Sequence, residues 1–156
     1  MRMTINRIPG LLAAALSLSL ALPAAAQTKV QHIQSADSGI ANAVWSGDTL
    51  YVSGKLAKSF DGDTRTQTAD VLKQFEATLR EQGLGMGDVV QMRVYLVADA
   101  AGKLDFAGMN EAYKEYFGTA AQPNKPARAT VQVAALVVPK ALVEIEVVAV
   151  RGKPAK

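Results

Sequence analysis

The fold is decided by a stretch near the C-terminus, Leu142-Val143-Glu144-Ile145-Glu146-Val147-Val148-Ala149-Val150. Almost every residue in it favours β structure, so the stretch predicts a strand. Successive side chains of a strand point to opposite faces of the sheet. Glu144 and Glu146 then share one face, while the valine and isoleucine residues between and beside them share the other. The strand therefore has one face suited to a core and one face with two carboxylates.

Working outward from this strand, the chain shows three more strand patterns and two helix patterns. β-branched and aromatic residues, in places alternating with polar ones, predict strands over residues 48–54, 90–96 and 128–136. Val44 is expected to belong to a strand that pairs with the first of these. Apolar residues at helical spacing predict helices over 64–82 and about 103–117.

This order of elements, strands, helix, strand, helix and strands, predicts an α+β sandwich. Its mixed sheet would carry both helices on one face. Two helices cover only one face of such a sheet, so the opposite face, where apolar, needs another subunit. The sequence thus predicts an oligomer.

Composition excludes several classes of function. The 156 residues include no cysteine and one histidine, His32, so a thiol nucleophile, a cysteine metal site and a histidine pair are excluded. The formal net charge is +3, but residues 1–26 hold two arginines and no acidic residue, and without them it is +1. A net charge of +1 is not the strongly basic charge typical of a nucleic-acid-binding protein. No nucleic acid is therefore expected as a partner. Neither a dinucleotide-binding glycine pattern nor a Walker lysine occurs.

The first 26 residues have the pattern of a secretory signal peptide. Arg2 and Arg7 precede the apolar run 11–22, and small residues at Ala24 and Ala26 suit cleavage before Gln27. The apolar run is shorter than the roughly 20 residues that span a bilayer, which disfavours an uncleaved anchor. We therefore expect a signal peptide at 1–26, a domain at 27–156, a periplasmic or secreted location and no membrane association after cleavage.

Three charged side chains are candidates for chemistry. Glu144 and Glu146 interrupt the most apolar stretch of the mature chain, where an unpaired buried charge costs several kcal/mol. The two carboxylates suit acid/base catalysis. The alternative is that their face of the strand is solvated or that each carboxylate is neutralised by an arginine. Arg128 opens its strand just after the loop that Pro123 and Pro126 bracket, and a guanidinium there can bind a carboxylate through two parallel N–H donors. Its alternative role is an internal ion pair with Glu144 or Glu146.

Several segments together resemble the RidA family, the reactive intermediate deaminases formerly called YjgF. They cover residues 38–151 and include 47–54, Gln67-Thr68, 87–90, Phe106 with Met109-Asn110 and Tyr113, Phe117, 126–133 and 143–146 with Ala149. The resemblance implies a chorismate-mutase-like fold and a homotrimer whose sheets form a central barrel, with pockets in the clefts between subunits. It also implies hydrolysis of enamines and imines of small carboxylates to 2-keto acids and ammonia, without cofactor or metal, as by a 2-iminobutanoate/2-iminopropanoate deaminase.

The resemblance further assigns roles to four residues. It implies that Arg128 holds the substrate carboxylate and that Glu144 lies near the attacking water. Asn110 matches a pocket asparagine, and Thr130 occupies a position where many members carry cysteine.

The chain departs from the deaminase members at two places. The segment around Ile40 lacks the tyrosine that they carry, and Lys55 follows the Ser-Gly pair where they have glutamine. These departures concern the identity of the substrate. The alternative function is that of a non-catalytic periplasmic small-ligand binder or chaperone-like protein. The endoribonuclease activity attached to the family's name is the weakest hypothesis, because the charge is near neutral and the chain has no histidine pair.

Overall fold

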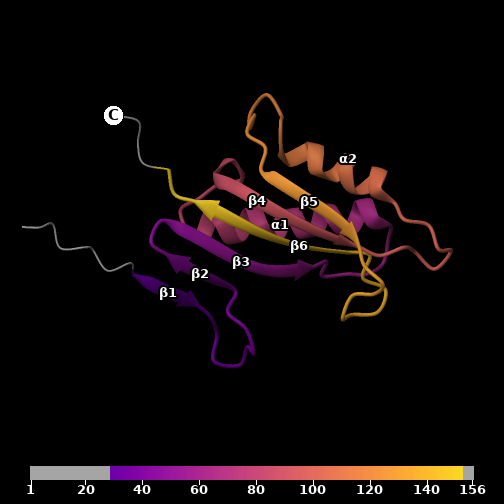
Figure 1. The fold of residues 1–156 in the computed structure, drawn as a ribbon, viewed down its shortest axis with the longest axis horizontal. Helices are drawn as coiled ribbons and strands as arrows, with labels where there is room; N and C mark the ends of the chain where they lie inside the picture. The colour runs from indigo at the N-terminus through magenta and orange to yellow at the C-terminus, as the bar shows by residue number, and fades with distance from the viewer. Residues whose placement is uncertain (1–28, 153–156) are drawn as a thin grey trace, which may run out of the picture.

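A mixed β-sheet of six strands forms the body of the chain in the computed structural model, which describes residues 29–152 (Figure 1). The strand order across the sheet is β1-β2-β3-β6-β4-β5, and all neighbours are antiparallel except β4 and β5. The strands are β1 Val30–Ile33, β2 Ala43–Ser46, β3 Thr49–Leu56, β4 Val89–Leu96, β5 Ala127–Gln132 and β6 Val143–Val150.

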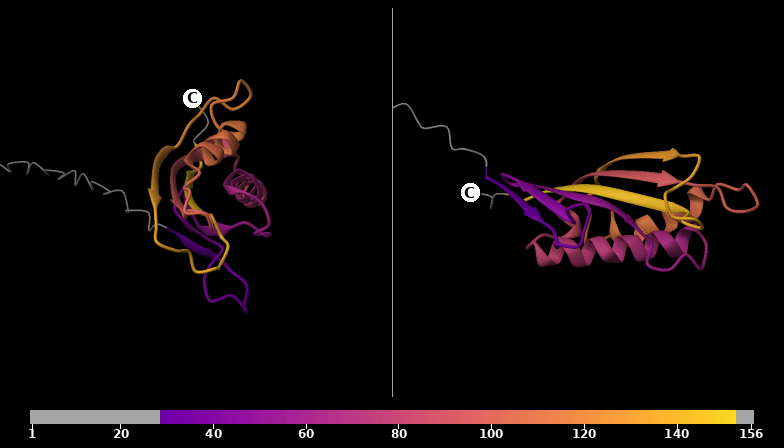
Figure 2. Two further views of the ribbon diagram at one scale, coloured as in Figure 1. Left: turned by 90° about the vertical axis from the view of Figure 1, so that its right-hand side faces the viewer. Right: turned by 90° about the horizontal axis from the view of Figure 1, so that it is seen from below.

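The helices α1 (Thr64–Glu81) and α2 (Phe106–Tyr116) lie side by side on one face of the sheet (Figure 2). A short 3₁₀ helix, η1 (Met86–Asp88), leads into β4. The opposite face of the sheet carries no helix within the described residues. The structure confirms the predicted α+β fold with both helices on one face.

The core lies between the helices and the sheet. Burial along β6 alternates residue by residue, as the sequence predicted, with the buried set facing the helices. The core residues that are fully buried include Leu50, Phe75, Met92, Met109 and Ile145. Each buried side chain of this size stabilises the fold by about 1.5–3 kcal/mol, so this layer holds the helices against the central strands of the sheet.

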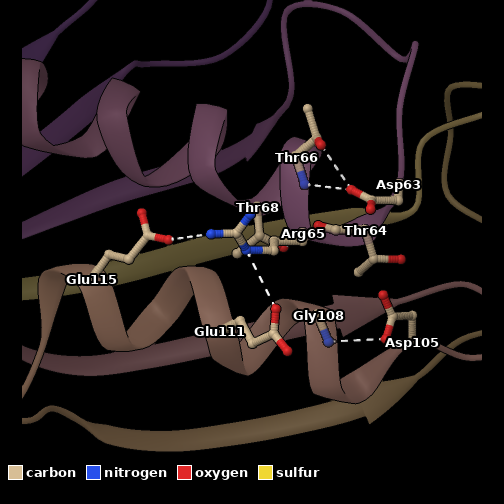
Figure 3. A network of polar contacts seen from close by, with 9 residues as sticks. All are labelled: Asp63, Thr64, Arg65, Thr66, Thr68, Asp105, Gly108, Glu111 and Glu115. Atoms are coloured by element: carbon tan, nitrogen blue, oxygen red, sulfur yellow. Dashed lines mark hydrogen bonds and ion pairs between the residues drawn. The ribbon is translucent and has the colours of Figure 1, made fainter.

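Polar contacts at the helix starts fix where α1 and α2 begin (Figure 3). Asp63 caps α1 by accepting from the backbone N–H of Thr66 at 2.8 Å, and Asp105 caps α2 in the same way from Gly108. Arg65 of α1 forms ion pairs with Glu111 and Glu115 of α2 and joins the two helices.

The structure corrects two of the predicted boundaries and adds one strand. The strand predicted over 128–136 ends at Gln132, because β5 is an edge strand whose only neighbour, β4, ends at Leu96. The helix predicted from residue 103 begins at Phe106, after the Asp105 cap. Strand β1 was not predicted, although Val44 does lie in a strand that pairs with β3. The predicted signal peptide lies outside the described residues.

Candidate functional site

Arg128 projects from β5 toward α2, where three side chains hold its guanidinium. Its Nη2 donates a 2.7 Å hydrogen bond to Asn110 Oδ1, and its Nη1 lies 3.8 Å from the sulfur of Met109. The guanidinium carbon stands 4.4 Å from the centre of the Tyr113 ring, within the range of a cation–π interaction. These contacts fix the position of the charge and leave donors free for a ligand.

The groups that hold Arg128 are themselves positioned by α2. Asn110 donates its amide N–H to the carbonyl of Phe106 one turn earlier, which leaves its oxygen for Arg128. The Tyr113 ring stacks on Phe117 with centroids 4.8 Å apart. Burial raises the pKa of the Tyr113 phenol, against the opposing effect of the Arg128 charge, so the ring beneath the guanidinium stays neutral at physiological pH.

Thr130 lies two residues after Arg128 on the same face of β5. Its hydroxyl oxygen is buried, and no hydrogen-bond partner for it exists among the described residues. A buried hydroxyl without a partner costs about 1–3 kcal/mol. The hydroxyl is therefore an unsatisfied buried polar group on the strand that carries Arg128.

Glu144 and Glu146 lie on the opposite, helix-free face of the sheet. In the register of β4 and β6, Tyr95 faces Glu144 and Arg93 faces Glu146. Arg93 forms a 2.5 Å ion pair with Glu146, whose oxygen also accepts a 3.4 Å hydrogen bond from the Tyr95 hydroxyl. Glu146 raises the pKa of the Arg93 guanidinium by hydrogen bonding to it and by its charge. Glu146 thus has the neutralised role that the sequence left open for it.

Glu144 has a different environment from Glu146. None of the ion pairs within residues 29–152 includes it, and its carboxylate rests against the backbone of Gly54 in β3. A Cβ atom at position 54 would overlap Glu144 Oε1, so a side chain there would displace the carboxylate from this position. The glutamate is held in place without being neutralised.

The sequence-predicted residues therefore fall into two groups. Arg128, Asn110 and Thr130 lie together on the helix side of β5, whereas Glu144 lies on the other face of the sheet. Arg128 forms no ion pair with Glu144 or Glu146, so the internal pairing considered for it does not occur. Within one copy of the chain, the candidate residues thus form two groups, or candidate half-sites, on opposite faces of the sheet.

Sequence reasoning did not assign a role to three residues of these half-sites. Tyr113 supports the guanidinium, and Arg93 and Tyr95 hold Glu146. The signal for Tyr113 was its place three residues after Asn110, which sets both on one side of a helix. Arg93 had no such signal, because its pairing depends on the register between two distant strands.

The described residues offer neither a metal-binding cluster nor a membrane-spanning helix. No group of three or more histidine, aspartate or glutamate side chains in residues 29–152 could hold a metal ion. Within that same range no helix has the length and hydropathy to cross a membrane.

The described residues form an α+β protein whose sheet carries Arg128 on one face and Glu144 on the other, and neither side chain forms an ion pair within residues 29–152. Residues 26–151 match the sequence model of the family described as Endoribonuclease L-PSP. The chain belongs to this family, the RidA or YjgF family, which includes imine deaminases.

Relatives and solved structures agree with that assignment. A RutC family protein of Pyrococcus horikoshii is 39% identical over 114 residues, which cover 69% of this chain and 82% of the relative. A rat protein named 2-iminobutanoate/2-iminopropanoate deaminase is 39% identical over 111 residues, covering 67% and 74%. A crystal structure of a YjgF family member from Neisseria meningitidis has a TM-score of 0.66 at 30% identity and covers 81% of this chain and 98% of its own.

Proposed function

We propose that the chain hydrolyses reactive enamines and imines of small carboxylates to 2-keto acids and ammonia, without a cofactor. The observation that carries the proposal is the Arg128 guanidinium, which Asn110 and Tyr113 hold in place and which no carboxylate of residues 29–152 neutralises. Such a group suits a ligand carboxylate. The name of the rat relative supports the choice of imine as the reacting group.

In the proposed complex, Arg128 binds the carboxylate of an imine of the form R–C(=NH₂⁺)–COO⁻. The buried Thr130 hydroxyl lies beside it as a further hydrogen-bond donor. Anchoring the carboxylate places the neighbouring C=N carbon, and orientation of this kind contributes up to several kcal/mol to the rate.

Glu144 supplies the acid/base step of the proposed reaction. Its carboxylate takes a proton from water as the oxygen adds to the C=N carbon, and the proton passes to the nitrogen. The C–N bond then breaks as the C=O bond forms, Glu144 takes the hydroxyl proton of the adduct, and the departing ammonia accepts this proton and leaves as ammonium. Such proton transfer contributes about 10²–10⁴ in rate.

The placement of Arg128 and Glu144 on opposite faces supports an active site that is shared between copies. Arg128 of one copy and Glu144 of the next would meet in a cleft, because a single sheet separates them within one chain. The helix-free face, which exposes Tyr51 and Val131, is the surface that further copies would cover. We propose a homotrimer, in which each of three clefts receives one half-site from each neighbour.

Complementation between inactive variants tests this function and its shared site. An amino-acid oxidase generates 2-iminopropanoate from alanine, and semicarbazide captures the imine that the protein does not hydrolyse. Arg128→Ala and Glu144→Gln should each abolish the acceleration. When the two variants are unfolded and refolded together in equal amounts, random assembly into trimers should return both groups to about a quarter of all clefts.

The outcomes of this test separate the possible functions. Restored activity of about one quarter supports both hydrolysis and a shared site. Activity of the wild type without restoration in a verified mixed trimer overturns the shared site. A wild type that accelerates no imine but is stabilised by small 2-keto acids in a thermal-shift assay favours the non-catalytic binder.

We also propose that the mature chain is periplasmic or secreted. The support is the sequence pattern of residues 1–26 alone. Expression in a Gram-negative host followed by fractionation and mass spectrometry tests it, with an N-terminus at Gln27 in the periplasm as the expected result. A full-length chain retained in the cytoplasm would contradict it.

A further inference from the structure

A cavity of about 460 Å³ lies among the C-terminal half of α1, the end of α2 and the segment that leads into η1. None of the residues of the candidate functional site lines it. The volume falls in the range of small-molecule binding sites. Its wall combines charged, aromatic and apolar side chains, namely Glu76 and Arg80 of α1, Glu115 and Tyr116 of α2, and Leu84 and Met86.

The charged groups of this cavity are only partly used by the protein itself. Glu115 forms an ion pair with Arg65 at 2.7 Å (Figure 3). Glu76 and Arg80 stand four residues apart on α1, a spacing that permits an ion pair. They form neither that pair nor any other within residues 29–152. One carboxylate and one guanidinium of the wall are therefore available to an occupant.

The apolar part of the wall is fixed in place by the protein. Leu84 and Met86 are each 8% exposed and belong to the hydrophobic core. The loop after α2 is held by Gln122, whose side-chain amide donates to the carbonyl oxygens of Tyr116 and Asn124 at 3.0 and 3.1 Å. Because these contacts already order the wall, a ligand loses little of its binding free energy to ordering it.

Tyr116 lies beside the carboxylates of the cavity. Burial raises the pKa of its phenol, and the charges of Glu76, Glu115 and Asp70 raise it further. The phenol is therefore neutral at physiological pH. Its ring offers a surface on which an aromatic or apolar group can pack close to the carboxylates.

We propose that this cavity binds a zwitterion with a large apolar side chain, that is, a free α-amino acid such as phenylalanine. Arg80 binds the carboxylate of the ligand, and Glu76 binds its ammonium group. The side chain of the ligand packs between the Tyr116 ring and the apolar wall at Met86. A ligand with only one charge would leave one of the two protein charges unused. The proposal does not depend on imine hydrolysis, because no step of that reaction uses this cavity.

Four ligands test the three parts of the proposal by isothermal titration calorimetry with the purified protein. Phenylalanine carries all three groups, 2-phenylethylamine lacks the carboxylate, 3-phenylpropanoate lacks the ammonium group and glycine lacks the apolar side chain. Each loss should weaken binding at least about fivefold. The series is repeated in Arg128→Ala, where a carboxylate bound at the candidate functional site cannot contribute, and the same order of affinities is expected.

Variants of α1 assign each ligand group to its partner. Arg80→Gln should weaken the binding of phenylalanine at least about fivefold without weakening that of 2-phenylethylamine, which has no carboxylate. Glu76→Gln should weaken phenylalanine to a similar extent without weakening 3-phenylpropanoate, which has no ammonium group. Lys73→Gln and Glu81→Gln are the matched controls, because both side chains are exposed on α1 outside the cavity wall, and they should leave all four affinities unchanged.

Calorimetry measures binding without turnover, so the results separate this proposal from the proposed function. If phenylalanine does not bind, or if any of the other three ligands binds as tightly, the proposed ligand class is wrong. Affinity for phenylalanine that both Arg80→Gln and Glu76→Gln retain overturns the assigned site. Affinity that disappears in Arg128→Ala places the ligand at the candidate functional site and overturns it as well. Failure to accelerate any imine would overturn the proposed function alone.

Discussion

The two faces of the sheet hold their functional groups by different means. On the helix side, Arg128 is enclosed by Asn110, Met109 and Tyr113 of α2, so the helix positions the cation. On the bare face, Glu144 rests against Gly54, whereas Glu146 forms an ion pair with Arg93.

The difference bears on the proposed division between anion binding and proton transfer. An arginine and a glutamate in direct contact would neutralise each other, and neither would be available to a substrate. Within residues 29–152, Arg128 and Glu144 lie on opposite faces and neither forms an ion pair. Under the proposed function, the two groups would meet where copies assemble.

The largest expected effect is on kcat and separates the role of Glu144 from that of Glu146. Glu144→Gln removes the proposed base with little change in shape, and kcat for imine hydrolysis should fall by about 100-fold or more. Glu146→Gln is the matched control, because it alters the adjacent carboxylate on the same strand face, and kcat should stay within about fivefold. Steady-state kinetics measure kcat for both variants. Equal decreases in kcat would show that the two carboxylates do not have different roles.

The next largest effect concerns the geometry of the cation. Arg128→Lys keeps the charge but loses the paired donors and the contact with the Tyr113 ring. KM should rise about 30-fold, which corresponds to the loss of about 2 kcal/mol from one charged hydrogen bond.

Arg93→Lys is the control on the bare face, where the cation pairs with Glu146. Its KM should stay close to that of the wild type. A KM that Arg128→Lys leaves unchanged would mean that charge alone binds the substrate.

A smaller effect tests how Glu144 is held. Gly54→Ala places a Cβ atom against Glu144 Oε1, so the carboxylate must move and kcat should fall about tenfold. Gly39→Ala is a matched control, because a Cβ atom there meets nothing within 4 Å. Thermal unfolding of both variants checks that the loss is local. Full activity in Gly54→Ala would show that the position of the carboxylate does not matter.

The two faces also differ in how far the sequence predicted them. The alternation in residues 142–150 was enough to assign the faces of β6, because period-two burial is a local property of a strand. The length of α1 followed from its spacing of apolar residues and from the glycine that comes after it. Strand β1 was missed because its four residues show no alternation and lie largely exposed.

Other features depend on contacts between distant segments, which no local pattern contains. Asn110 and Arg128 meet because α2 packs over β5, and the resemblance to a family pointed to both without showing that they touch. The placement of Arg128 and Glu144 on opposite faces depends on the register of β4 with both β5 and β6. Alternation within each strand shows which residues share a face, but the register decides which face that is.

The smallest expected effect is on stability and concerns Lys55, the cation on the helix side of the sheet. Lys55 lies on the helix side, with Nζ 5.8 Å from the centre of the Phe75 ring, and burial lowers its pKa. Between this lowered pKa and the ordinary lysine value, the unfolded chain binds more protons than the folded chain, so the free energy of unfolding rises with pH across that window. Lys55→Gln should remove this rise and stabilise the protein at pH 7 by less than about 1 kcal/mol. Urea unfolding at pH 7 and pH 10 measures both effects, and Lys73→Gln, an exposed position on α1, should retain the wild-type difference between the two pH values. If Lys55→Gln leaves the pH dependence of the free energy of unfolding intact, that dependence comes from another group. Burial of the Lys55 cation under the helices would then have no measurable effect on stability.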